Sequence, residues 1–186
     1  MQKSSLQMSK KCILNEQLLD ITIQRLCYQI IENHGDFSNS VFIGLQPKGI
    51  FFATKIKKVL EKLTSSTIPL GYLDTTFHRD DFRRRATPVE ASSTDIPFTI
   101  EGKKVVVIDD VLFTGRSVRA ALDAMITFGR PEKVELVILI DRKYTRDLPI
   151  EANYIGKQID SLFSQKVEVT WKINNAEQDA VWLVTN

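Results

Sequence analysis

Two adjacent aspartates, Asp109 and Asp110, stand where the sequence changes from an apolar run to a small polar turn. The run Val105–Ile108 precedes them, and Thr114-Gly115-Arg116-Ser117 follows a few residues later. Carboxylates accept hydrogen bonds from sugar hydroxyls, whereas free amides in a turn or at a helix N-terminus bind phosphate. Because carboxylates repel phosphate, the two halves should hold different parts of one ligand. The residue types therefore favour a sugar phosphate.

The elements around the aspartates place them at one edge of a sheet. The β-branched run before them is apolar on both faces, which is typical of a strand buried between helices. Two more predicted strands end in polar residues: Ser40–Leu45 before Gln46-Pro47-Lys48-Gly49, and Val134–Ile140 before Asp141-Arg142. Ligands of open α/β sheets bind beyond the carboxyl ends of the strands. We therefore expect these three strand ends to form one site.

Strands and helices alternate through residue 140, which predicts an α/β fold with a parallel sheet and helices on both faces. Asn15 is the predicted N-cap of a helix that ends at His34-Gly35, and a second helix starts at Ile50. A third helix follows Ser117 and ends near Gly129. The other predicted strands are Lys11–Leu14, Ile68–Asp74, Glu151–Gln158, Lys166–Ile173 and Ala180–Thr185.

The composition is that of a globular protein with one domain. The chain has 186 residues, 43% hydrophobic and 26% charged, and a net charge of +2, too small to imply a nucleic-acid partner by itself. We expect a disordered tail over residues 1–10 and a single domain over residues 11–186. Cys12 and Cys27 are predicted core residues without a disulfide, which suits a reducing cytoplasm. The chain shows no apolar leader or membrane-spanning run, so we expect a cytoplasmic protein.

Common nucleotide fingerprints are absent from the sequence. Gly44 and Gly49 have the spacing of a Walker A start, but Ile50 occupies the position of its lysine, and no G-x-G-x-x-G motif occurs. A receiver-type signalling domain also carries paired acids at a strand end. Such a domain does not explain the Thr-Gly-Arg-Ser turn.

The stretch Val105–Ser117 closely resembles the phosphoribosyl-diphosphate (PRPP) motif of type I phosphoribosyltransferases. From about Ile13 to the C-terminus, the chain is most similar to the pyrimidine operon regulators that double as uracil phosphoribosyltransferases. The other matching stretches are Asp74–Asp81, Val107–Ala120, Phe128–Pro131, Asp141-Arg142 and Leu148–Lys157. The resemblance implies the type I phosphoribosyltransferase fold, with a mainly parallel sheet, a small hood and a flexible loop.

The resemblance also implies a role for each part of the site. Asp109 and Asp110 would hold the ribose hydroxyls, and Arg79 and Asp81 belong to a loop that would close over the site. These four are the implied catalytic residues. Mg²⁺ would be held by PRPP oxygens and not by a cage of protein ligands. The implied PRPP residues are Asp109, Asp110, Val111, Leu112, Phe113, Thr114, Gly115, Arg116 and Ser117, with Gln46, Pro47, Lys48 and Gly49 facing the pyrophosphate and Asp141 and Arg142 bordering the base.

Two stretches depart from the family pattern. The pyrophosphate turn often reads Lys-Thr-Arg, where this chain has Gln46-Pro47-Lys48. The base-side loop Lys143–Asp147 is one residue longer than the common form, and Lys143 replaces a frequent glycine. Arginine and lysine are not equivalent at a pyrophosphate because arginine offers a planar fork of donors.

The resemblance implies conversion of uracil and PRPP to UMP and pyrophosphate, with transcript attenuation by binding a pyrimidine-operon mRNA leader when UMP or UTP is present. Arg83, Arg84, Arg85, Lys55 and Lys58 are the candidate RNA contacts. A homo-oligomer, either a dimer or a tetramer, is expected. Two alternatives stay open: a catalytically weak, nucleotide-sensing RNA-binding regulator, and a phosphoribosyltransferase for another base such as hypoxanthine.

Overall fold

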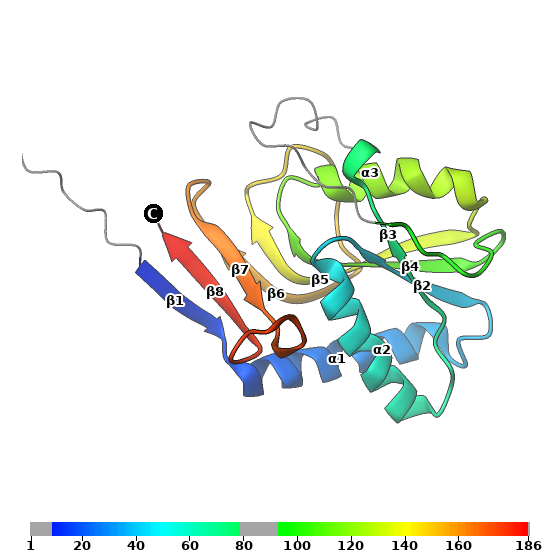
Figure 1. Ribbon diagram of the computed structural model, residues 1–186, viewed down its shortest axis with the longest axis horizontal. Coiled ribbons are helices and arrows are strands. Elements are labelled where there is room, and N and C mark those ends of the chain that lie inside the picture. The colour runs from blue at the N-terminus through cyan, green and yellow to red at the C-terminus, as the bar shows by residue number, and fades with distance from the viewer. Residues whose placement is uncertain (1–8, 79–92, 186) are drawn as a thin grey trace, which may run out of the picture.

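Five parallel strands form the central sheet of the computed structural model, which describes residues 9–78 and 93–185. Their spatial order is β3-β2-β4-β5-β6, so the strand that carries the aspartates, β4, lies in the middle (Figure 1). The predicted parallel sheet is therefore confirmed. The strands are β2 (Ser40–Leu45), β3 (Leu70–Leu73), β4 (Lys104–Leu112), β5 (Lys133–Lys143) and β6 (Tyr154–Asp160).

Helices cover both faces of this sheet, as the alternation of strands and helices predicts. Helices α1 (Glu16–His34) and α2 (Gly49–Thr64) pack on one face, and α3 (Arg116–Met125) packs on the other (Figure 1). Asn15 caps α1 as predicted, because its side chain accepts a hydrogen bond of 2.9 Å from the Leu18 amide. Short 3₁₀ turns are η1 (Thr76–His78), η3 (Ile126–Phe128) and η4 (Lys172–Asn174).

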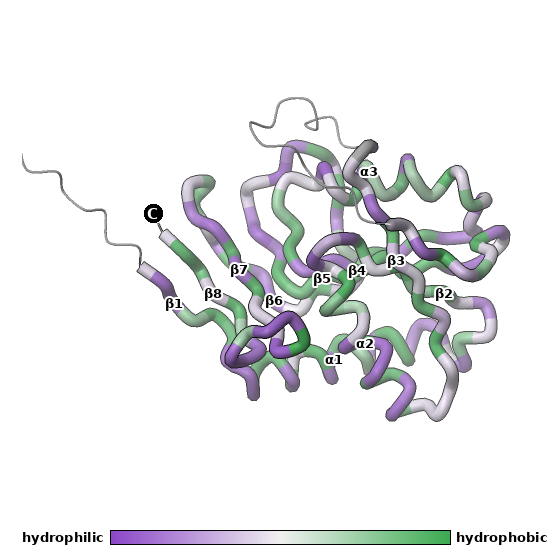
Figure 2. The backbone as a smooth tube through the Cα atoms, in the orientation of Figure 1, coloured by the Kyte–Doolittle hydropathy of each residue, from purple (hydrophilic) through white to green (hydrophobic). Residues whose placement is uncertain are grey.

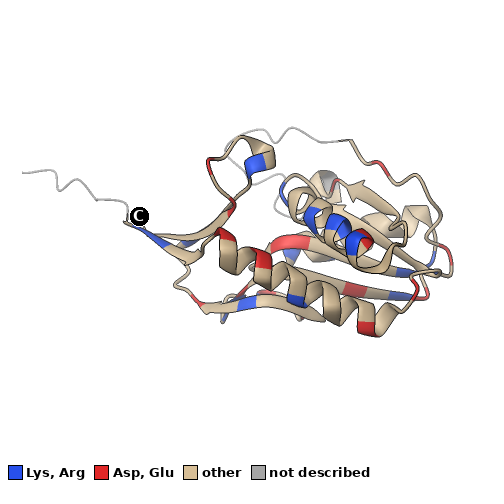
Figure 3. Cartoon of the chain, turned by 90° about the horizontal axis from the view of Figure 1, so that it is seen from below, with Lys and Arg blue, Asp and Glu red and all other residues tan. Residues whose placement is uncertain are grey.

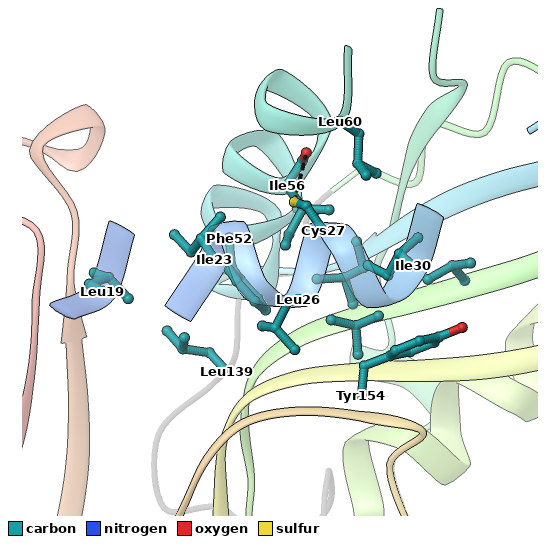
Figure 4. Packing of buried hydrophobic residues seen from close by; sticks show 14 of the residues in the cluster. Leu19, Ile23, Leu26, Cys27, Ile30, Phe52, Ile56, Leu60, Leu139 and Tyr154 are labelled. Atoms are coloured by element: carbon teal, nitrogen blue, oxygen red, sulfur yellow. Dashed lines mark hydrogen bonds between the residues drawn. The ribbon is translucent and has the colours of Figure 1, made fainter. Parts of the chain in front are cut away.

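The two-helix face holds the larger core. Figure 4 shows side chains of α1 such as Leu26 pointing between Phe52 of α2 and Leu139 of the sheet. Figure 2 shows the same division along the backbone, with hydrophobic strands inside and mixed helices outside. The core prediction for Cys12 is wrong because Cys12 is exposed, whereas Cys27 is buried as expected, and both cysteines are free.

Three antiparallel strands form a separate hood sheet: β1 (Ser9–Leu14), β8 (Ala180–Thr185) and β7 (Lys166–Thr170), in the order β1-β8-β7. Strand β1 begins before the domain boundary that we placed at residue 11. An ion pair with a buried carboxylate joins the segment before β8 to α2, since the Asp179 carboxylate accepts hydrogen bonds from Lys55 Nζ and, at 2.6 Å, from the Lys172 amide. Within the described parts of the chain, none of the helices combines the length and apolarity that crossing a bilayer requires.

The end of α1 carries a buried polar cluster far from the aspartates along the strands. His34 Nδ1 lies 2.8 Å from Ser40 Oγ, and its Nε2 lies 2.7 Å from a Glu135 carboxylate oxygen. Burial lowers the pKa of His34, and the Glu135 carboxylate partly offsets that effect. His34 therefore ends the helix, as predicted, and also pins it to β2 and β5.

Candidate active site

Asp109 and Asp110 lie within β4, not after it, because β4 and β5 both continue past their apolar cores. Leu112 of β4 is still paired with Asp141 of β5, so the strand extends past both aspartates. Asp109 Oδ1 accepts a hydrogen bond of 2.9 Å from the Asp110 amide. Burial raises the pKa of Asp110, and the charge of Lys48 opposes that rise. Burying a carboxylate is costly for structure alone, so Asp110 is a candidate functional residue.

A small pocket follows the aspartates at the start of α3. Its volume is about 130 Å³, which suits a group of the size of a phosphate. Gly115 lies at φ +89°, and a Cβ there would meet Ile150 Cγ1 at 3.1 Å, so the tight turn requires glycine. The pocket is lined by Asp109, Val111, Leu112, Phe113, Thr114, Gly115, Arg116, Ser117 and Val118, so the structure brings the predicted PRPP stretch together apart from Asp110.

The turn between β2 and α2 lies directly against the aspartates. A Cβ on Gly49 would come within 2.8 Å of the Ile108 carbonyl oxygen and 2.9 Å of Asp109 Oδ1. The Gln46–Pro47 peptide is cis, and Gln46 donates a hydrogen bond of 2.5 Å from Nε2 to the Ser93 carbonyl. The predicted pyrophosphate turn is therefore adjacent to the acidic pair. The Gln46 side chain of this turn, however, is hydrogen-bonded to the backbone at Ser93.

Asp141 and Arg142 lie at the same edge of the sheet, and both are buried. The Asp141 carboxylate is engaged by Arg146 and accepts a hydrogen bond of 3.1 Å from Gln158 Nε2. Arg142 donates hydrogen bonds of 2.8 Å to Ser161 Oγ and to the Leu162 carbonyl. These partners are the side chains and backbone of the protein itself. Both residues thus shape this edge of the site through internal contacts.

Two aromatic residues lie near Arg142: Phe113 belongs to the predicted PRPP stretch, whereas Phe163 was not predicted from the sequence. The Arg142 guanidinium lies 4.0 Å from the ring centre of Phe113, and the Phe113 and Phe163 rings are 5.1 Å apart. Phe163 is 72% exposed, although an apolar ring usually favours burial. No local pattern could have linked residues so far apart in sequence. Only the folded sheet brings them together, with the two ring planes tilted by 47°.

Five of the predicted residues, Arg79, Asp81, Arg83, Arg84 and Arg85, lie outside the described residues. Among the candidate RNA contacts on α2, Lys58 is exposed, whereas Lys55 is paired with the buried Asp179.

Asp109 and Asp110 are the candidate site residues whose carboxylate oxygens could interact with a magnesium ion. Within residues 9–78 and 93–185, no group of three or more His, Cys, Asp or Glu side chains is placed to hold a metal ion. Two carboxylates offer oxygen ligands, which Mg²⁺ prefers, and the ion commonly completes its shell with substrate phosphates and water. The residues present thus fit an ion that arrives with a phosphorylated ligand.

The sequence and the fold have known counterparts. Residues 10–174 match the family model of the phosphoribosyl transferase domain. The chain is 43% identical over 164 residues to a bifunctional protein PyrR of Actinobacillus succinogenes, covering 86% of this chain and 90% of that one. It is 39% identical over 177 residues to the bifunctional protein PyrR of Listeria monocytogenes, covering 94% and 96%.

A solved structure shares the fold at low sequence identity. The hypoxanthine-guanine phosphoribosyltransferase of Bacillus anthracis superposes with a TM-score of 0.71 at 17% identity, covering 97% of this chain and 100% of that one. The fold, the acidic pair beside the phosphate-sized pocket and the relatives all agree. The chain belongs to the type I phosphoribosyltransferase family, in the branch of the bifunctional PyrR proteins.

Proposed function

We propose that the protein is a uracil phosphoribosyltransferase that converts uracil and PRPP to UMP and pyrophosphate, and that it also regulates pyrimidine biosynthesis genes. The observation that carries the enzymatic part is the acidic pair near the end of β4, of which Asp110 is buried, beside the phosphate-sized pocket. This arrangement separates groups that bind hydroxyls from a turn that binds phosphate. The likeness to PyrR relatives at 37–43% identity favours uracil over other bases.

The ribose-phosphate part of PRPP would occupy the β4–α3 edge. Asp109 and Asp110 would accept hydrogen bonds from the ribose hydroxyls, and the turn at Thr114–Ser117 would bind the 5′-phosphate with its amides. Lys48 at the start of α2 would face the pyrophosphate as a point charge. Mg²⁺, held by PRPP oxygens beside the acidic pair, would neutralise charge on the leaving group.

The bond change is a displacement at C1 of the ribose. A ring nitrogen of uracil forms the new bond to C1 while the bond from C1 to the pyrophosphate oxygen breaks. The uracil proton leaves to solvent or to pyrophosphate. Positive charge develops on the ribose ring, where the carboxylates of Asp109 and Asp110 stabilise it. The base would lie near the exposed Phe163 ring, with Arg142 and Asp141 shaping the edge of its pocket.

A panel of bases tests the enzymatic part. Purified protein is incubated with PRPP, Mg²⁺ and uracil, hypoxanthine, guanine or cytosine, and nucleotide formation is followed by chromatography. UMP should form, and the other bases should react at least about a hundredfold more slowly. A comparable rate with hypoxanthine, or no UMP at high protein concentration, would sink the proposal.

The regulatory part is uridine-nucleotide-dependent binding to a pyrimidine-operon mRNA leader. Its support is the bifunctional name of the relatives and the basic cluster Arg83-Arg84-Arg85. Over the described residues, acidic and basic positions are interspersed (Figure 3), and Lys58 is the exposed candidate on α2. UMP or UTP should tighten binding to the leader over a scrambled RNA in a filter-binding assay. Equal binding to both RNAs, with or without nucleotide, would contradict this part.

A homo-oligomer in the cytoplasm completes the proposal. Leu122, Ile126 and Met125 help to line an apolar hollow of about 480 Å³ at the far end of α3. Ile126→Glu should shift a dimer or tetramer to monomer in light scattering. An unchanged mass would exclude this surface. The two free cysteines suit a reducing cytoplasm.

A further inference from the structure

Arg146 joins three separate parts of the candidate site. Its Nε donates a hydrogen bond of 3.1 Å to the Ile150 carbonyl, and a terminal nitrogen donates to the Phe113 carbonyl. The other terminal nitrogen is paired with the Asp141 carboxylate. The three acceptors are Ile150, in the connection between β5 and β6, Phe113, directly before the turn Thr114–Ser117 (the phosphate turn), and Asp141, near the end of β5. One guanidinium therefore connects the elements that would bind base and phosphate.

The loop that carries Arg146 is fastened to the phosphate turn by further contacts. The amides of Asp147 and Leu148 donate to the Thr114 carbonyl at 3.1 and 3.2 Å. Arg116 Nε lies 3.2 Å from Asp147 Oδ2. The Arg146 side chain is 23% exposed and thus mostly enclosed by these groups.

The contacts dictate which way the peptide groups of the turn face. In a trans peptide the carbonyl and the following N–H point in opposite directions. Because the carbonyls of Phe113 and Thr114 are drawn toward the base-side loop, the amides of Thr114 and Gly115 point away from it. Both residues line the phosphate-sized pocket. A fixed direction of these amides is what an anion site requires, since it avoids reorganisation when the ligand binds.

We propose that Arg146 is a positioning residue that aligns the phosphate turn, and that Asp141 acts on ligand binding through Arg146. The identity of the ligand, PRPP, rests on the proposed function. Asp141 is suited to this task because its carboxylate is buried and already shared between Arg146 and Gln158. A lysine at 146 keeps the charge but cannot reach three acceptors in different directions, because it lacks the planar fork of arginine.

The experiment measures the affinity of ribose 5-phosphate, which carries no base, by isothermal titration calorimetry. Arg146→Lys should weaken binding roughly tenfold, the loss of about one charge-assisted hydrogen bond. Asp141→Asn should weaken binding in the same direction by a smaller factor. In turnover assays, Arg146→Lys should raise KM for PRPP by a larger factor than it lowers kcat.

Arg25→Lys is the matched control. Arg25 also donates from its guanidinium to backbone carbonyls, those of Ile155 and Gly156, but it does so on α1, outside the site. Its replacement should change the affinity for ribose 5-phosphate less than twofold, even where the melting temperature falls as much as in Arg146→Lys. Native affinity in Arg146→Lys, or equal loss in both variants, would overturn the positioning role. A native protein that binds ribose 5-phosphate but makes no UMP would overturn only the proposed uracil activity.

Discussion

Replacing Lys55 with methionine should destabilise the protein by about 2 kcal/mol, whereas Lys58→Met should cost less than about 0.5 kcal/mol. Both lysines lie on α2, but only Lys55 is paired with Asp179, whose side chain is 2% exposed. Breaking a fully buried pair costs about 3–5 kcal/mol because the remaining charge has no partner. The Lys55 side chain is 33% exposed, and the Lys172 amide still donates to Asp179 in the variant. We therefore expect a loss of stability smaller than that of a fully buried pair.

Urea denaturation followed by circular dichroism measures this difference. At the size of this chain, about 2 kcal/mol corresponds to a fall of roughly 4–8 °C in the melting temperature. Adding Asp179→Asn to Lys55→Met should recover most of the loss, because it removes the unpaired charge. A Lys55→Met variant as stable as Lys58→Met would refute the reasoning and return Lys55 to the candidate RNA contacts.

The pH dependence gives an independent check on the same pair. Burial raises the pKa of Asp179, but the hydrogen bonds from Lys55 and the Lys172 amide outweigh burial and hold it below the ordinary value of 3.8. The pair thus contributes stability above that value, and the contribution is lost as the pH falls through the lowered pKa. The gap between the two variants should therefore be full at pH 7 and should shrink below about pH 4.

Three further predictions concern the site and the first helix. Burial raises the pKa of Asp110, so the stability of the native protein falls as the pH rises from the ordinary carboxyl pKa through the raised one. In urea denaturation at pH 7, Asp110→Asn should therefore be at least as stable as the native protein. The same variant should lose affinity for ribose 5-phosphate. Gly49→Ala should cost about 1–3 kcal/mol and weaken PRPP binding, because its Cβ would meet the Ile108 carbonyl; native calorimetric and binding values would exclude that clash. Asn15→Ala should cost about 1 kcal/mol in thermal melts, and Asn15→Asp, which keeps the acceptor, should not.

The sequence sufficed for the parts of the site that are local. Asp109, Asp110 and the Thr114–Ser117 turn are close in the chain, so strand and turn patterns alone place them at one edge of the sheet. The cap at Asn15 follows from the same kind of local rule. The predicted ends of the strands were less accurate. Pairing between β4 and β5 continues past their apolar runs, since Leu112 and Asp141 are still partners.

Contacts between distant segments could not be predicted from patterns. Phe163 follows β6 and Phe113 follows β4, two strands that are separated by β5 in the sheet, so their contact depends on the whole fold. No pattern near either residue in the sequence predicts it. In the sequence, Arg146 is one of several charged residues in a loop, and only the structure shows its three acceptors. The prediction for Cys12 was wrong for another reason: Cys12 lies on β1, an edge strand of the hood whose first four residues are all exposed, so apolar neighbours in the sequence did not imply burial.

The most direct test of the account is the rate of UMP formation from uracil and PRPP by the native protein and by Asp110→Asn. The native protein should form UMP with Mg²⁺ present, and Asp110→Asn should lose at least about a hundredfold in kcat/KM while staying folded. UMP formation that is undiminished in the variant, or absent in the native protein, would contradict the assignment of this edge of the sheet as a uracil phosphoribosyltransferase site.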